Sequence, residues 1–201
     1  MKVWILIFVC MFSMPLLVAV LHFRMRKGQI LKIRQDYVKN ARYFGRSFSA
    51  LVEKALPEMK NGMIMLSRQE KVLETDGKQE FVQPEIEDLV IARNTIFCPQ
   101  QEDLHFQKEI YSEKDALFVK ENIRLRAVYS KKRIVFGNKI RLLRWADAEH
   151  AVAVYDECDL GERVSSGEQL VIGFDNIFHS LYAPVIRLGQ RPEEPDRFME
   201  E

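Results

Sequence analysis

The sequence is poor in the residues from which metal sites, disulfide frameworks and common catalytic centres are built. Its 201 residues include only three cysteines and four histidines. No Cys-x-x-Cys, His-x-x-x-His or other paired spacing of these residues occurs, which argues against a structural or catalytic metal site. The phosphate loop G-x-x-x-x-G-K-[ST] and the nucleophile elbow G-x-S-x-G are absent as well. We therefore expect no metal, no cofactor and no catalytic residue, and a protein that is not an enzyme.

An excess of charge of one sign is lacking too. The formal net charge is +1, so nothing in the overall charge indicates nucleic acid as a partner. Of the cysteines, Cys10 lies in an apolar N-terminal run, and only Cys98 and Cys158 remain. Two such cysteines make no disulfide framework, which agrees with a reducing compartment.

One long hydrophobic run is present, at the N-terminus. Residues 3–23 contain no Asp, Glu, Lys or Arg, and the run reaches the about 20 residues that a helix needs to cross a bilayer. A secretory signal peptide is the alternative, but no clear small-x-small cleavage motif precedes the basic residues that follow. The sequence therefore predicts an uncleaved transmembrane anchor over residues 1–23.

Basic residues cluster directly after this run. The cluster consists of Arg24, Arg26, Lys27, Lys32 and Arg34. Because positive flanks stay in the cytoplasm, we expect a single-pass protein of the cell inner membrane with its C-terminal domain in the cytoplasm. The cluster is predicted to lie at the membrane surface, with membrane lipids as partners and envelope proteins as further expected partners.

The sequence also predicts the nature of residues 24–84 and of the C-terminal residues 189–201. Apolar residues at spacings of three and four predict a basic amphipathic helix over residues 24–57, ended by Pro57. This helix is expected to lie on the membrane surface or to pack over the first coil of the next domain as a cap.

Residues 58–84 are assigned to a connecting or capping segment. The acidic segment of residues 189–201 is assigned to a disordered tail.

The central region repeats with a period of six residues. Two columns of this repeat hold mostly apolar or small residues: Phe136, Leu142, Ala148, Val154, Leu160, Ser166 and Ile172 in one, and Ile140, Ala146, Val152, Cys158, Val164, Leu170 and Asn176 in the other. Four glycines share one phase: Gly137, Gly161, Gly167 and Gly173. A hexad is one side of a coil of about 18 residues, which is typical of parallel β-solenoids.

The repeat predicts an all-β fold, a single β-solenoid of about five to six coils over residues 85–188. Earlier coils are expected to place Leu117, Val119 and Ile123 inward, and before them Leu89 and Ile91. An antiparallel sandwich also recurs with turns every 8 to 12 residues, but it does not explain glycines in one six-residue phase.

The segment VYDECDLGERVSSGEQLVIG at residues 154–173 resembles bactofilins and, more weakly, hexapeptide-repeat acyltransferases. Bactofilins are polymer-forming cytoskeletal proteins of bacteria, whose β-helix domain stacks end to end. That resemblance implies a non-catalytic scaffold at the envelope that associates with itself. The acyltransferase resemblance implies trimers with a catalytic histidine, for which His150 is the candidate, although His150 is also read as a solvated loop residue.

Two further groups of residues are candidates for contact surfaces. The final coil is strongly apolar, and Phe178, Leu181 and Tyr182 are the predicted self-association residues. Most apolar residues of that coil are expected to close the core, with Phe178 as the residue to test for assembly. Arg144, Trp145 and Asp147 form a possible surface for a glycan or lipid. Ser166, in an inward column, is read as a small corner residue and not as a nucleophile.

Overall fold

The computed structural model describes residues 2–25, 40–75 and 77–192. The chain divides into two compact units, Met1–Gln35 and Asp36–Glu201. The first contains helix α1 (Lys2–Met25), with Pro15 inside it.

The predicted transmembrane helix requires correction. No helix in the described ranges combines the length and the apolar character that a membrane crossing needs. The prediction of a membrane-spanning helix at residues 1–23 is therefore contradicted.

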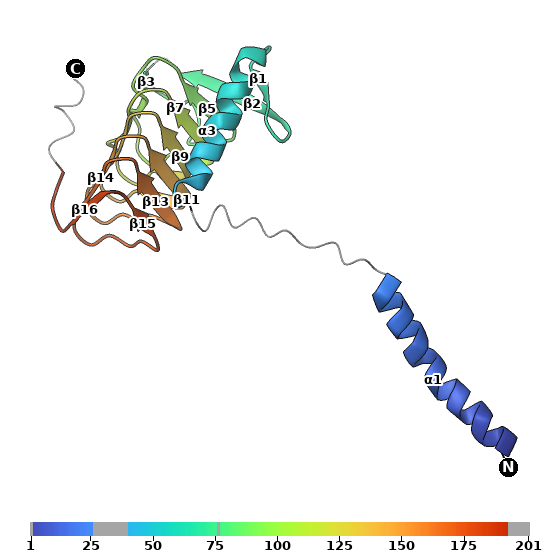
Figure 1. Cartoon of the computed structure of the whole chain (residues 1–201). Helices are drawn as coiled ribbons and strands as arrows, with labels where there is room; N and C mark the ends of the chain where they lie inside the picture. The colour runs from blue at the N-terminus through green and yellow to red at the C-terminus, as the bar shows by residue number, and fades with distance from the viewer. Residues whose placement is uncertain (1, 26–39, 76, 193–201) are drawn as a thin grey trace. The chain divides into compact units, whose positions relative to one another are not determined.

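The second unit is a parallel β-solenoid of about six turns (Figure 1). Its largest sheet is made of β1 (Met63–Met65), β2 (Gln69–Thr75), β4 (Glu85–Ile86), β5 (Leu89–Ala92), β7 (His105–Ser112), β9 (Arg124–Ser130), β11 (Arg141–Ala148), β13 (Arg163–Ser166) and β15 (Leu181–Tyr182). A second sheet is made of β8 (Ala116–Phe118), β10 (Arg133–Phe136), β12 (Ala151–Val154), β14 (Gln169–Ile172) and β16 (Val185–Leu188). A small third sheet joins β3 (Lys78–Gln79) to β6 (Cys98–Pro99).

Parallel pairing confirms the predicted all-β solenoid. Among the strand pairs of the described residues, only β1 and β2 run antiparallel. The parallel ladder already begins between β2 and β5, so the first coil starts before residue 85. The long strands are irregular in register between Phe106 and Glu109 and between Leu142 and Trp145, where the chain bends from one side of the coil to the next.

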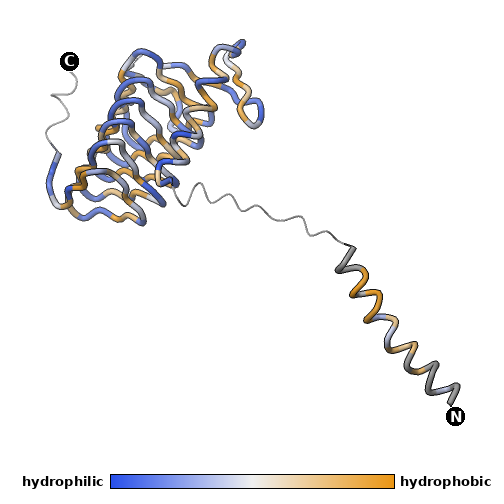
Figure 2. Tube along the Cα trace, in the orientation of Figure 1, coloured by the Kyte–Doolittle hydropathy of each residue, from blue (hydrophilic) through white to orange (hydrophobic). Residues whose placement is uncertain are grey.

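The hexad columns point inward as predicted. Every residue of both columns is buried except Asn176, and hydrophobic and hydrophilic residues alternate along the coils (Figure 2). Asn176 is half-buried, and its side-chain amide makes two hydrogen bonds to the backbone of the preceding coil. The amide oxygen accepts a hydrogen bond of 2.8 Å from the N–H of Cys158, and the amide nitrogen donates one of 2.7 Å to the carbonyl of Tyr155.

The glycine phase reflects the close stacking of coils. A Cβ added to Gly137 would collide with the carbonyl oxygen of Phe118 in the preceding coil. Gly161 has a φ of 59°, and a Cβ added to it would come still closer to a carbonyl oxygen, that of Leu142. This position therefore needs both the missing side chain and the left-handed conformation of glycine. The glycines that share one phase of the hexad therefore mark the positions where one coil touches the backbone of the preceding coil.

Two upstream coils are shifted by one residue from the predicted register. Ile134 and Phe136 pair with Ala116 and Phe118, so Phe118 points inward in place of Leu117 and Val119. In β5 the inward residues are Val90 and Ala92, whereas Leu89 and Ile91 face the other side of the sheet.

Helix α3 (Tyr43–Ala55) packs on the outer face of the large sheet and continues into the 3-10 turn η1 (Leu56–Glu58). Its buried residues Val52 and Ala55 pack in a cluster with Leu89, Ile91 and Tyr111 of the sheet. Of the helix predicted over residues 24–57, residues 26–39 lie outside the described residues, and α3 starts only at Tyr43. The helix packs along the side of several coils.

Candidate self-association surface

The last coil leaves the edges of both main sheets open. Strand β15 pairs only with β13, and strand β16 pairs only with β14, among the described residues. The outer edge of such a strand presents unpaired N–H and C=O groups that can pair with another chain.

The same coil exposes a large apolar surface. Seven side chains in it have exposed fractions between 41% and 64%: Phe174, Ile177, Phe178, Tyr182, Val185, Ile186 and Leu188. Leu181 and Ala183 differ from these seven, because both are half-buried and pack against the central core. The expectation that most apolar residues of this coil close the core is therefore wrong, since within the described residues no further coil lies over them. These seven residues together form what we call the C-terminal apolar face.

The opposite end of the solenoid is built differently. There β1 pairs with β2 in antiparallel fashion, and Ile64 of β1 is buried. The exposed large hydrophobic residues near this end are Met63, Met65 and Val82. The two ends are thus unlike, and the C-terminal end carries more exposed apolar side chains.

The three residues of the predicted ligand surface, Arg144, Trp145 and Asp147, differ in their exposure to solvent. Helix α3 covers part of it, and the ring of Trp145 lies edge to face with that of Phe48, with centroids 5.6 Å apart. Asp147 is only 1% exposed. Arg144 alone faces solvent, so the three side chains do not form one binding surface.

Asp147 instead belongs to a buried ion pair that sequence reasoning missed. The Nε of Arg42 lies 2.8 Å from Oδ1 of Asp147, and Arg42 also donates to the carbonyl of Ala148 at 2.9 Å. The hydroxyl of Ser165 donates to Asp147 at 2.7 Å. Burial raises the pKa of the Asp147 carboxyl, whereas Arg42 and Ser165 oppose that rise. The pair ties the start of α3 to β11, and no sequence pattern links Arg42 to a strand so far along the chain.

The residues weighed as catalytic candidates have ordinary surroundings. Nδ1 of His150, a residue with an exposed side chain, lies 2.7 Å from a carboxylate oxygen of Glu168. Ser166 is buried, and its hydroxyl donates to the carbonyl of Gln169 at 2.8 Å. Groups of three or more His, Cys, Asp or Glu that could hold a metal ion do not occur in the described part of the chain. Of the basic cluster, Arg26, Lys27, Lys32, Arg34 and the side chain of Arg24 lie outside the described residues.

Both solenoid cysteines are expected to be chemically inert. Burial raises the pKa of the Cys158 thiol to about 11, and the thiol lies 3.0 Å from the carbonyl of Gly137. Burial raises the pKa of the Cys98 thiol as well. Because the thiolate is the reactive form, we expect maleimide to leave both residues unmodified in the native protein and to modify them in denaturant. Peptide mapping by mass spectrometry measures this, and rapid native labelling of either cysteine would contradict the placement of both thiols in the fold.

No family model, no curated protein and no solved structure matches the chain.

Proposed function

We propose that this chain is a non-catalytic scaffold that associates with itself through the end of its β-solenoid, as in the polymer-forming bactofilins that its repeat resembles. The observation that supports the proposal is the C-terminal apolar face, which combines seven exposed apolar side chains with two open strand edges. Exposed apolar groups gathered at an open sheet edge are a recurrent sign of an association surface.

The difference between the two ends favours a closed dimer over a filament. A filament needs a second contact at the N-terminal end, where β1 pairs with β2 and few apolar side chains are exposed. Contact between two C-terminal apolar faces is isologous and closes after two copies. A two-fold axis through β16 places the two copies of this strand antiparallel, so that their open edges can exchange hydrogen bonds.

The size of the face suggests a dimer of moderate affinity. Fully burying a large apolar side chain stabilises by about 1.5–3 kcal/mol, and the residues of the face are already about half buried in one copy. Two copies therefore gain on the order of 10 kcal/mol, which is comparable with the cost of association, about 4–15 kcal/mol. We expect the dimer to dissociate on dilution.

The substitution Phe178→Asp tests the contact. Phe178 is 41% exposed in the last coil, so a charge placed there costs the fold little but must be desolvated when two faces meet. We expect the variant to elute as a monomer at concentrations where the unmodified chain is dimeric, as measured by size-exclusion chromatography with light scattering.

Two matched variants separate this contact from other effects. Leu143→Asp places the same charge at a residue that is 66% exposed on the side of the solenoid, and Val82→Asp places it near the N-terminal end. Both should remain dimeric. Intact assembly in Phe178→Asp would overturn the proposal, and loss of assembly in Val82→Asp would show that the N-terminal end takes part.

A further inference from the structure

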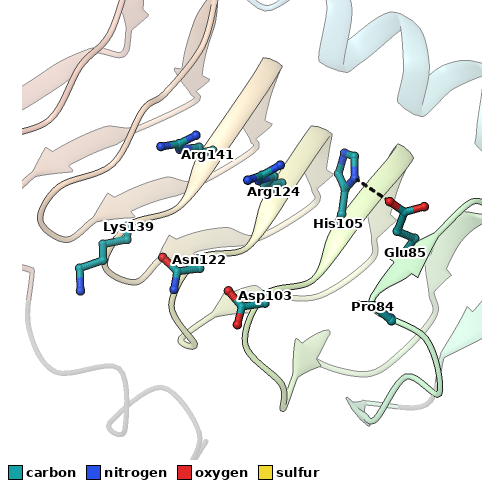
Figure 3. A pocket seen from close by; sticks show the side chains of 8 residues that line it. All are labelled: Pro84, Glu85, Asp103, His105, Asn122, Arg124, Lys139 and Arg141. Atoms are coloured by element: carbon teal, nitrogen blue, oxygen red, sulfur yellow. Dashed lines mark ion pairs between the residues drawn. The ribbon is translucent and has the colours of Figure 1, made fainter.

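A second surface, on the side of the solenoid, presents arginines in register. His105, Arg124 and Arg141 begin β7, β9 and β11, and they are direct partners in the ladder, with Arg124 opposite both His105 and Arg141. Adjacent strands are about 4.8 Å apart, so the two guanidinium groups start from neighbouring backbone positions. Figure 3 shows the three side chains pointing to the same side from successive strands.

These two arginines lack the ion pairs that neighbouring cations make. Arg126, two residues after Arg124, lies 3.1 Å from Glu109, and Lys139 lies 2.8 Å from Glu121. Within the described part of the chain, no carboxylate lies within 4.0 Å of the side chains of Arg124 or Arg141. Like charges directly opposite each other destabilise a sheet, so the pair has a local cost, and no ion pair among the described residues offsets it.

The arginines border two hollows in the surface. One, of about 360 Å³, includes Asp103, Asn122 and Lys139 in its lining, as Figure 3 shows. The other, of about 440 Å³, lies toward Leu142 and Leu143. Both hollows are lined by His105, Arg124 and Arg141. A ligand in either hollow can therefore reach the two guanidinium groups.

Acidic residues limit how far the positive surface extends. On one side of the ladder Glu85 pairs with His105 at 4.0 Å, and on the other Asp159 is the in-register neighbour of Arg141. Asp103 adds a third carboxylate at the rim of the first hollow. A long polyanion such as nucleic acid would meet these carboxylates, whereas one compact anionic group between the two arginines would not.

We propose that Arg124 and Arg141 together bind a single phosphate group, carried either by a soluble molecule or by a lipid headgroup. Guanidinium groups bind the oxygens of phosphate through paired, charge-assisted hydrogen bonds. A tetrahedral anion offers oxygens to two guanidiniums at once and removes their mutual repulsion. The site is independent of the association surface, because none of its residues belongs to the C-terminal apolar face.

The test uses the full chain and two probes, one for each source of phosphate. Inorganic phosphate is titrated by calorimetry, and flotation compares phosphatidylcholine vesicles with and without phosphatidic acid, the difference between the two vesicles being the measured quantity. We expect binding to at least one probe. Arg124→Gln and Arg141→Gln should each weaken that binding at least tenfold and leave the melting temperature unchanged.

Two further variants make the result specific. Arg144→Gln removes an exposed arginine of β11 that does not line either hollow, and it should keep the affinity of the unmodified chain. Glu85→Gln removes a nearby negative charge and should tighten binding. Binding of phosphate indicates a soluble ligand, and a response to phosphatidic acid alone indicates a lipid headgroup. The proposal is overturned if neither probe binds, if the Arg124 and Arg141 variants bind normally, if Arg144→Gln weakens binding equally, or if Glu85→Gln fails to tighten it.

Discussion

Replacing Arg42 with alanine is expected to lower the free energy of unfolding by about 3–5 kcal/mol. The substitution leaves the carboxylate of Asp147, which is 1% exposed, without its cationic partner. An uncompensated buried charge is far more costly than the loss of an exposed ion pair. Because Arg42 directly precedes α3, the helix should also loosen from the sheet. Urea denaturation followed by circular dichroism measures the loss.

Arg46 provides the matched control. It lies 3.8 Å from Glu149 and its side chain is 55% exposed, so Arg46→Ala should cost about 0–1 kcal/mol. The double substitution Arg42→Met with Asp147→Leu, which removes both charges, should recover much of the stability lost in Arg42→Ala. Equal losses for Arg42→Ala and Arg46→Ala would contradict the buried ion pair.

Truncating Phe118 to alanine is expected to destabilise the solenoid by about 3–5 kcal/mol. Phe118 is fully buried, and its ring centroid lies 5.7 Å from the centroids of both Phe97 and Phe136, in the preceding and the following coil. Its removal leaves a cavity that spans the contact between coils, and stacked coils depend on such contacts with their neighbours. The midpoint of urea unfolding should shift accordingly.

Leu143→Ala is the control for this second prediction. Leu143 is 66% exposed on the side of β11, so its truncation should change stability by no more than about 0.5 kcal/mol. If Phe118→Ala were as mild as Leu143→Ala, Phe118 would not lie in the core, and the residue pointing inward would be Leu117 instead.

The regular coils were predictable where buried and partly exposed residues alternate along a strand. In β12 and β14 every second residue is buried and the residues between are at least partly exposed, so the hexad there separates inward from outward positions. In β5 all four residues are buried, because α3 covers the outer face there. Alternation then cannot tell Leu89 and Ile91 from Val90 and Ala92, which explains the shift of one residue.

A similar limit applies to β8. Ala116 gives a weak apolar signal, whereas Leu117 is buried beside Cys98 and Val135 on the other side of the strand. The sequence therefore favoured Leu117 as the inward residue, although pairing with β10 places Ala116 and Phe118 there.

The candidate surfaces were less accessible to sequence reasoning than the fold. Phe178 and Tyr182 were predicted for self-association, and their exposure is compatible with that role. Burial of the other apolar residues of the last coil depends on whether another coil follows, which composition does not reveal. The pairing of Arg124 with Arg141 depends on strand register, so these residues become neighbours only once the coils are stacked.

The central claim, that two solenoids join through their C-terminal apolar faces, is tested most directly by sedimentation velocity of the full chain over a range of concentrations. We predict a reversible equilibrium between monomer and dimer that does not grow further as concentration rises. A monomer at every concentration would contradict self-association. Filaments would require a second contact at the N-terminal end, and a discrete trimer would favour the acyltransferase-like interpretation, so either result would contradict the closed dimer.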